Sequence, residues 1–210
     1  MNYLVRLGWS HGDQEIFSID EMAELFDIHE VNHAASAFNP EKLLWLNHHY
    51  IKTSPVEYIA RQLMPRLGRL GIDPSEGGPD ILEVVEALRE RARTLIEMAD
   101  MSQYFYRDFE EFDETAAKKH LRPVCEDPLM LAREHLAALD EWTVEALHAV
   151  VTVVSEELDL NMGKVAQPLR VAISGRSATP GIDVTLYLVG REQTLARIDR
   201  ALDYISDRKA

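Results

Sequence analysis

Apolar residues recur every three or four positions along most of the chain, the spacing that places them on one face of an α-helix. Between residues 80 and 98 this spacing is regular, and it predicts one long helix. It predicts further helices over residues 40–51, 55–67, 128–139, 143–158, 163–174 and 190–207, with one more between 179 and 190. Residues 149–154 include β-branched residues that suit a strand, but the flanking positions keep the helical spacing.

Helix-start signals agree with this spacing. Ser18 and Glu21 form a capping-box pattern before an apolar stretch. The pair Asn39-Pro40 combines an N-cap residue with proline at the first helical position, and Ser54-Pro55 repeats that signal. These signals place helix starts near residues 19, 40 and 55.

The order of predicted elements defines the fold class. No alternation of strands and helices occurs, so a parallel sheet is excluded. Stretches rich in glycine, proline or charge interrupt the helices near residues 75–79, 110–114 and 122–128. We predict an all-α protein of consecutive helical bundles, divided into residues 1–53, 54–122 and 123–210.

Composition narrows the setting of the protein. The 210 residues include one cysteine, Cys125, which excludes an internal disulfide framework and a cysteine-based zinc cluster. No apolar run approaches the length of a membrane span, and the first residues do not resemble a signal peptide. We expect a reducing, cytoplasmic setting with no membrane contact.

The net charge of −14 argues against non-specific binding to nucleic acids, DNA included. The charge is uneven: residues 76–162 carry 8 basic and 21 acidic groups, whereas residues 163–210 carry 8 basic and 5 acidic groups. If the chain binds a polyanion, the last fifth and a few arginines elsewhere are the expected contacts.

One metal motif is present. His29, Glu30 and His33 match the H-E-x-x-H pattern of zinc peptidases, which requires one α-helix through both histidines. The segment reads instead as a helix end or loop, and no third ligand is evident. We expect no metal here, and a metalloprotease remains a weak alternative.

Other catalytic patterns are missing. The sequence contains no glycine-rich phosphate loop and no G-x-S-x-G nucleophile motif. Cys125 with nearby His120 is more typical of an incidental cysteine than of a nucleophile pair. The chain therefore offers no convincing active site.

Three arginines stand out within the acidic segment. On a helix, Arg89 and Arg93 would lie one turn apart and Arg91 would point elsewhere. A guanidinium group can bind a base edge or a phosphate through two parallel hydrogen bonds. The alternative, which residue chemistry alone favours, is ion pairing with acidic neighbours: Glu86, Glu90 and Glu97.

A second group of polar residues lies near the carboxy terminus. Gln167 and Arg170 would share a helix face, and Thr179 would cap the next helix. Free N–H groups at that helix start would favour an anion. A packing corner between two helices explains the same residues equally well.

Several separated motifs together resemble one family. They are Leu7-Gly8-Trp9-Ser10, the stretch NPEKLLWLNHHYI at 39–51, VAQPLR at 165–170, Thr179-Pro180-Gly181 and Leu188-Val189-Gly190-Arg191-Glu192. In this order and spacing they resemble the carboxy-terminal half of bacterial glutamyl-tRNA synthetase, from about residue 3 to residue 205. The HIGH-type and KLSKR-type signatures of that family's catalytic half are absent from the sequence.

The resemblance implies three helical parts: the end of a stem-contact region over 1–53 and two anticodon-binding subdomains over 54–122 and 123–210. It implies binding of tRNA-Glu as part of an enzyme that charges tRNA with glutamate in translation. ATP and Mg²⁺ would bind the catalytic half, so no cofactor and no catalysis are expected of this chain alone. A separate catalytic half is one expected partner, and the full-length family is usually monomeric. Apolar residues such as Leu4, Leu7 and Trp9 would pack on that half.

The resemblance also assigns residues. Arg91 matches the arginine that reads the third anticodon base and excludes the glutamine tRNA. Positions that contact anticodon bases are matched by Gln167, Arg170, Thr179, Pro180 and Ile182. Positions near the tRNA stem and the domain junction are matched by Lys42, Trp45 and Asn47. The competing hypothesis is a stand-alone helical scaffold for protein partners, suggested by the acidic middle segment.

Overall fold

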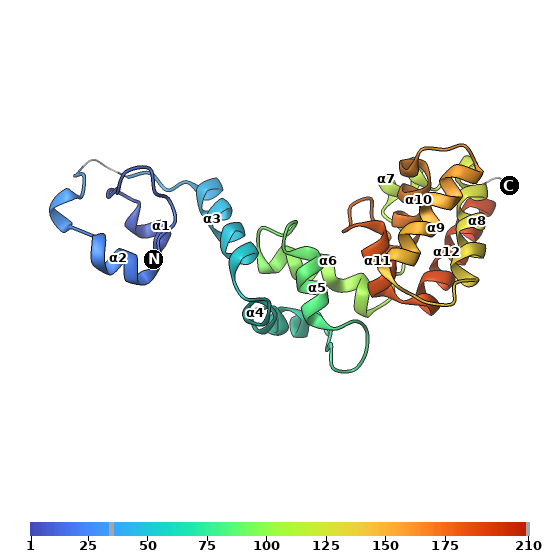
Figure 1. Cartoon of the computed structure of the whole chain (residues 1–210), viewed down its shortest axis with the longest axis horizontal. Coiled ribbons are helices and arrows are strands. Elements are labelled where there is room, and N and C mark those ends of the chain that lie inside the picture. Colours follow the sequence, from blue (N-terminus) through green and yellow to red (C-terminus); the bar gives the residue numbers. More distant parts are fainter. Residues whose placement is uncertain (34–35, 209–210) are drawn as a thin grey trace. The chain divides into compact units, whose positions relative to one another are not determined.

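The computed structural model describes residues 1–33 and 36–208, and every regular element within them is a helix (Figure 1). This confirms the predicted all-α class. The chain folds as two compact units, Met1–Ser54 and Pro55–Ala210. The further division near residue 122 stays a prediction.

In its described residues, 1–33 and 36–54, the first unit contains three α-helices and one 3-10 turn: α1 (Asn2–Val5), α2 (Ile19–Leu25), η1 (Ile28–Glu30) and α3 (Pro40–Thr53). The predicted caps are confirmed, because Ser18 and Glu21 form a reciprocal capping box and the Asn39 side chain accepts from the Lys42 N–H. Asn2 ties the unit together: its amide donates to the Glu15 carbonyl and accepts from the Phe17 N–H and the Tyr50 hydroxyl.

The small core of this unit is aromatic. Trp9 is only 2% exposed and packs against Phe17 and Phe26, with ring centroids 5.3 and 5.6 Å away. The expectation that Trp9 packs on another part of a longer protein is therefore wrong, because these rings already cover it. Leu4, in contrast, is 62% exposed and lines an apolar groove of about 540 Å³.

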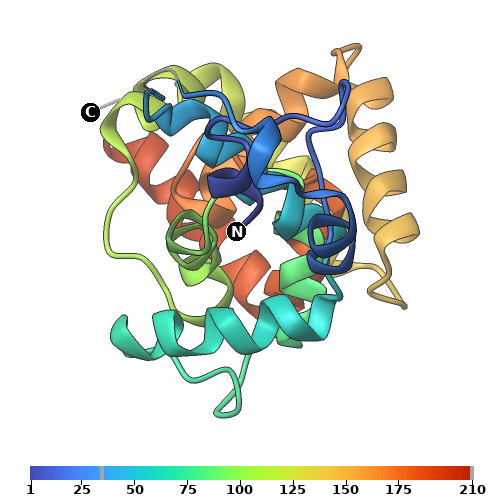
Figure 2. The ribbon, with the colours of Figure 1, turned by 90° about the vertical axis from the view of Figure 1, so that its left-hand side faces the viewer.

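The second unit contains the remaining helices: α4 (Val56–Arg69), α5 (Ile81–Leu88), α6 (Leu95–Tyr106), α7 (Glu114–His120), η2 (Pro123–Cys125), α8 (Glu126–Ala137), α9 (Val144–Glu157), α10 (Met162–Ser174), α11 (Ile182–Val189) and α12 (Arg191–Asp207). The loop of residues 70–80 projects away from α4 and α5 (Figures 1 and 2).

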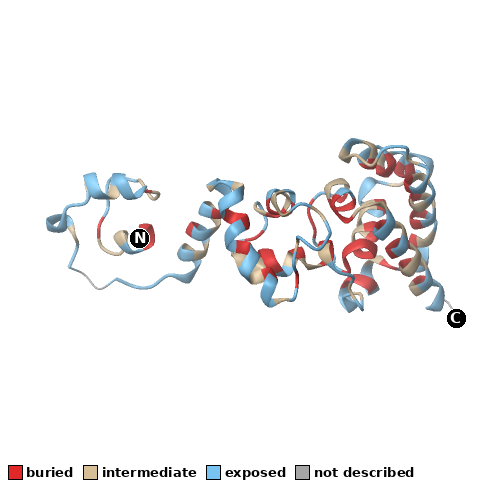
Figure 3. Cartoon of the chain, turned by 90° about the horizontal axis from the view of Figure 1, so that it is seen from below, coloured by how far each residue is buried: buried red, intermediate tan, exposed pale blue. Residues whose placement is uncertain are grey.

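Helix α10 is the central helix of the group α7 to α12. It packs against α7, α8, α9, α11 and α12, and its side chains Val165, Leu169 and Ile173 are fully buried. Figure 3 shows the buried residues along the facing sides of these helices. Helix α11 contacts α9, α10 and α12 as well as α5 and α6, so it joins the two helix groups of this unit.

The long helix predicted over residues 80–98 is wrong, because α5 ends at Leu88 and α6 begins at Leu95. Thr94 and Glu97 form a capping box at the start of α6, in which the Thr94 hydroxyl accepts from the Glu97 N–H at 3.1 Å. Ala92 in the connecting turn is fully buried. The local cap and this burial outweigh the continuous helical spacing.

Two predicted caps are also wrong. Ser54 donates its N–H to the Tyr50 carbonyl and so ends α3, while α4 starts after Pro55 with no side-chain cap. Helix α11 starts after Gly181, and Thr179 does not cap it. Among the described residues, no helix combines the length and the apolar character needed to cross a lipid bilayer.

Candidate nucleic-acid interface

The three arginines of the turn between α5 and α6 differ in their interactions. Arg89 forms an ion pair with Glu86 at 2.9 Å, so the ion-pair hypothesis holds for it. Arg91 is exposed, and no carboxylate lies within 4 Å of its guanidinium in residues 1–33 and 36–208. Because the helix ends at Leu88, the predicted helical spacing of Arg89 and Arg93 does not apply. Arg91 therefore offers a guanidinium whose hydrogen bonds are available to a ligand.

Arg170 on α10 is the cationic neighbour of Arg91. Burial lowers the pKa of the half-buried Arg170, and the positive charge of Arg91 lowers it further. Within residues 1–33 and 36–208, neither guanidinium group has a carboxylate within 4 Å. Two such groups that act on each other electrostatically make a local positive field suited to a hydrogen-bond acceptor or an anion.

Thr179 holds Arg170 in place. Its hydroxyl oxygen accepts from Nε of Arg170 at 2.8 Å and from the Thr185 hydroxyl at 3.2 Å. Thr179 is 2% exposed, and Pro180 and Ile182 are also buried. Arg170 also donates from Nη2 to the Pro180 carbonyl at 3.5 Å, so Thr179 and Pro180 support the guanidinium, which is the more accessible group.

Replacing Thr179 with valine is expected to destabilise the fold by about 1–3 kcal/mol, because a half-buried N–H of Arg170 loses its acceptor. RNA affinity should fall as well, since the guanidinium loses its orientation. Urea unfolding and RNA binding measure the two effects. Thr194→Val is the control, because the Thr194 hydroxyl on α12 is buried and makes no hydrogen bond to the described residues. An equal loss of affinity in both variants would contradict the orienting role of Thr179.

Gln167 lies one helical turn before Arg170 on α10. Its Oε1 atom is buried and has no hydrogen-bond partner within the described part of the chain. Buried amide oxygens nearly always have a donor, so an unsatisfied acceptor beside a cationic group is consistent with a ligand-binding surface. The structure thus brings Arg91, Arg170 and Gln167 to one region of the second unit.

The predicted stem-contact residues lie on α3 in the first unit. Lys42 pairs with Glu15 at 2.8 Å, and Arg6 pairs with the same carboxylate at 2.9 Å. These contacts hold the pKa of Glu15 below its usual range. Trp45 is 49% exposed, and its ring stacks on His49. Asn47 is exposed.

The H-E-x-x-H segment does not form an α-helix. Residues Ile28–Glu30 make a single 3-10 turn, and the chain after Val31 is irregular up to His33. The predicted loop is therefore confirmed, and the two histidines are not one α-helical turn apart. Within residues 1–33 and 36–208, no three His, Cys, Asp or Glu side chains gather in a metal-binding arrangement.

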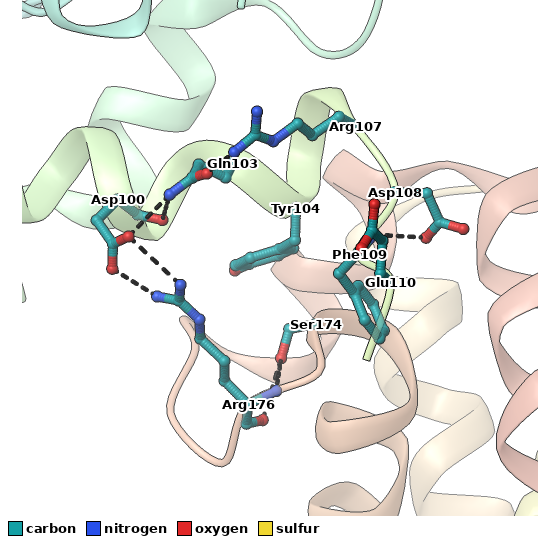
Figure 4. A pocket seen from close by; sticks show the side chains of 9 residues that line it. All are labelled: Asp100, Gln103, Tyr104, Arg107, Asp108, Phe109, Glu110, Ser174 and Arg176. Atoms are coloured by element: carbon teal, nitrogen blue, oxygen red, sulfur yellow. Dashed lines mark hydrogen bonds and ion pairs between the residues drawn. The ribbon is translucent and has the colours of Figure 1, made fainter. Parts of the chain in front are cut away.

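A polar pocket of about 430 Å³ beside α6 was not evident from the sequence (Figure 4). Asp100 on α6 pairs with Arg176 at 2.7 Å, and this pair connects α6 to the loop that carries Thr179. The hydrogen bond from Arg176 holds the pKa of Asp100 below its usual range. The partners are 76 positions apart, so no local pattern could have identified them.

The sequence of the second unit matches a known protein family. An anticodon binding domain model matches residues 58–202, which cover most of the second unit. The chain therefore belongs to the anticodon-binding domain family.

Two solved structures resemble the chain over nearly its whole length. A glutamate tRNA ligase from Elizabethkingia meningosepticum, in complex with its amino acid, matches with a TM-score of 0.86 and 28% identity over 97% of this chain. A glutamate-tRNA synthetase from Elizabethkingia anophelis matches with a TM-score of 0.81 and 28% identity over 96% of this chain. The chain spans about 40% of the length of these structures.

Proposed function

We propose that the chain recognises the anticodon of tRNA-Glu as the tRNA-binding part of a glutamate–tRNA ligase. The observation that carries this proposal is that two arginines of an anticodon-binding family member, Arg91 and Arg170, form no ion pair with a carboxylate in the described residues, and the charge of Arg91 acts on Arg170. Specific RNA recognition usually targets unpaired loop bases through their exposed edges. One bidentate contact between an arginine and a base contributes about 1–3 kcal/mol of discrimination.

The roles of individual residues follow from this proposal. Arg91 reads the third anticodon base, and Gln167 and Arg170 address the other bases. Thr179, Pro180 and Ile182 shape the surface beneath them, because all three are buried. Lys42, Trp45 and Asn47 on α3 approach the tRNA stem.

The same proposal divides the second unit into two subdomains. Residues 54–122, with α4 to α7, form one anticodon-binding subdomain, and residues 123–210, with α8 to α12, form the other. Helix α11 contacts α5, α6, α9 and α10, which supports a binding surface built from both parts.

The complete enzyme would charge its tRNA in the cytoplasm with ATP and Mg²⁺. The described chain contributes binding residues and no catalytic residue to that reaction. The overall charge of −14 is compatible with this role, since a few placed arginines supply specificity without a broad cationic surface. The acidic remainder disfavours non-cognate polyanions.

Competition binding tests the proposed function. Labelled tRNA-Glu bound to the purified chain is challenged with its own anticodon stem-loop, or with a minihelix that carries only its acceptor stem. We expect the stem-loop to displace the tRNA and the minihelix to leave it bound. Absence of tRNA binding, or equal displacement by both RNAs, would contradict anticodon recognition and favour a protein-interaction scaffold.

A further inference from the structure

A second cationic site lies beside the proposed anticodon surface. The cationic pocket, as we name it, has a volume of about 530 Å³ and lies between α7, η2 and the start of α10. Four basic residues line it: Lys119, His120, Arg122 and Lys164. Its remaining lining is apolar or uncharged, and no acidic residue of the described chain lines it. Such a pocket is unexpected in a protein with a net charge of −14.

The electrostatics of His120 show that these charges act together. Burial lowers the pKa of His120, and the positive charges of Lys119, Arg122 and Arg170 lower it further. The side chain of Arg170 is in turn subject to the charge of Arg91. A positive field therefore extends from the cationic pocket to the two arginines of the anticodon surface.

In the part of the chain that the structure describes, three cations of the pocket form no ion pair. Among residues 1–33 and 36–208, no carboxylate lies within 4 Å of Lys119, Arg122 or Lys164. The adjacent Lys118 shows the contrast, because it pairs with Glu114 one turn earlier on α7. Unpaired cations that share a concave surface favour a bound anion over solvent alone.

The start of α10 adds backbone donors. Asn161 caps this helix of 13 residues by accepting from the Lys164 N–H at 3.1 Å. The other N–H groups of the first turn have no partner within the helix. Gly163 lines the pocket and carries no side chain. At the place where a Cβ would lie, the nearby atom is Asn161 Oδ1, at 3.4 Å, so a ligand can approach the Gly163 backbone. A helix start of this kind binds phosphate through its N–H groups and its dipole.

Gln167 connects the two sites. It lines the cationic pocket and lies one turn before Arg170 on the same helix. An RNA strand whose base reaches Arg170 would therefore pass the pocket with its backbone.

We propose that the cationic pocket binds a backbone phosphate of the RNA loop whose bases contact Arg91 and Arg170, with Arg122 and Lys164 as the principal contacts. This inference rests on the proposed function and adds a phosphate site to it. A phosphate contact contributes affinity that is independent of base identity and depends on salt.

The salt dependence of RNA binding tests the phosphate site. The double variant R122Q/K164Q is compared with the wild type and with Lys118→Gln, which removes one paired charge outside the pocket. We expect the slope of log K against log salt to fall by about 0.7, the value for one phosphate neutralised on a single strand. The loss of affinity should be equal for tRNA-Glu and for a tRNA with a changed anticodon. Circular dichroism verifies that the variants are folded.

Neutral phosphate analogues give an independent test. Each phosphate of the anticodon loop is replaced in turn by an uncharged methylphosphonate. We expect one position at which the replacement weakens binding to the wild type but not to the double variant. If no position shows this difference, or if the double variant behaves like Lys118→Gln, the phosphate site is wrong.

The results that would contradict the phosphate site differ from the results that would contradict the proposed function. Wild-type binding that depends on the anticodon, together with an unaffected double variant, would remove only the phosphate site. Wild-type binding that is absent, or indifferent to the anticodon, would remove both proposals.

Discussion

Replacing Arg197 with alanine is expected to lower the free energy of unfolding by about 2–6 kcal/mol, because two buried carbonyl acceptors lose their donor at a cost of about 1–3 kcal/mol each. Arg197 on α12 is 4% exposed. It donates to the carbonyls of Tyr104 at 2.9 Å and Ile173 at 2.7 Å, and it pairs with Asp108 at 3.0 Å. The alanine variant leaves these acceptors without their donor and opens a cavity where α6, α10 and α12 meet.

Urea unfolding followed by circular dichroism measures this effect. Arg133→Ala is the matched control. Arg133 on α8 forms an arginine–aspartate pair with Asp199 on α12, the helix that carries Arg197, and both side chains of this pair are partly exposed. Exposed pairs contribute about 0–1 kcal/mol, so the control should stay close to the wild type. Similar losses in both variants would contradict the structural role of Arg197.

Replacing Arg91 with glutamine is expected to abolish most of the discrimination at the third anticodon base, a loss of about 1–3 kcal/mol or 5- to 150-fold in the affinity ratio. Glutamine removes the charge and the forked donor pair. Stability should stay within about 0.5 kcal/mol of the wild type, because Arg91 is exposed and has no ion-pair partner among the described residues.

The measurement is the ratio of dissociation constants for tRNA-Glu and for the same tRNA with its third anticodon base changed. Arg93→Gln removes the same charge from the same exposed turn. It should weaken binding to both RNAs alike and leave the ratio intact. A uniform loss in the Arg91 variant, with the ratio preserved, would show that Arg91 supplies only charge.

Capping residues and apolar spacing predicted the helices correctly where tertiary packing favoured the same boundaries. The Ser18–Glu21 capping box and the Asn39-Pro40 start are both present, and residues 149–154 are helical despite their β-branched side chains. The spacing failed between Leu88 and Leu95 because a second capping box begins a new helix there. Periodicity alone does not detect a break that preserves the apolar face.

The candidate site was predictable only in part. The arginine cluster and the family resemblance drew attention to Arg91 and Arg170, and in the structure the charge of Arg91 acts on Arg170. Two ion pairs of the second unit were not predictable, because Arg176 and Arg197 pair with residues 76 and 89 positions away. Thr179 was expected to cap a helix, but tertiary packing directs its hydroxyl to Arg170 instead.

The most direct test of the central claim is the affinity of the purified chain for tRNA-Glu and for the same tRNA with its third anticodon base changed, at near-physiological salt. We expect tighter binding of tRNA-Glu by about 5- to 150-fold, the range for one bidentate arginine–base contact. Equal affinity for the two RNAs, or no binding to either, would contradict anticodon recognition by this chain.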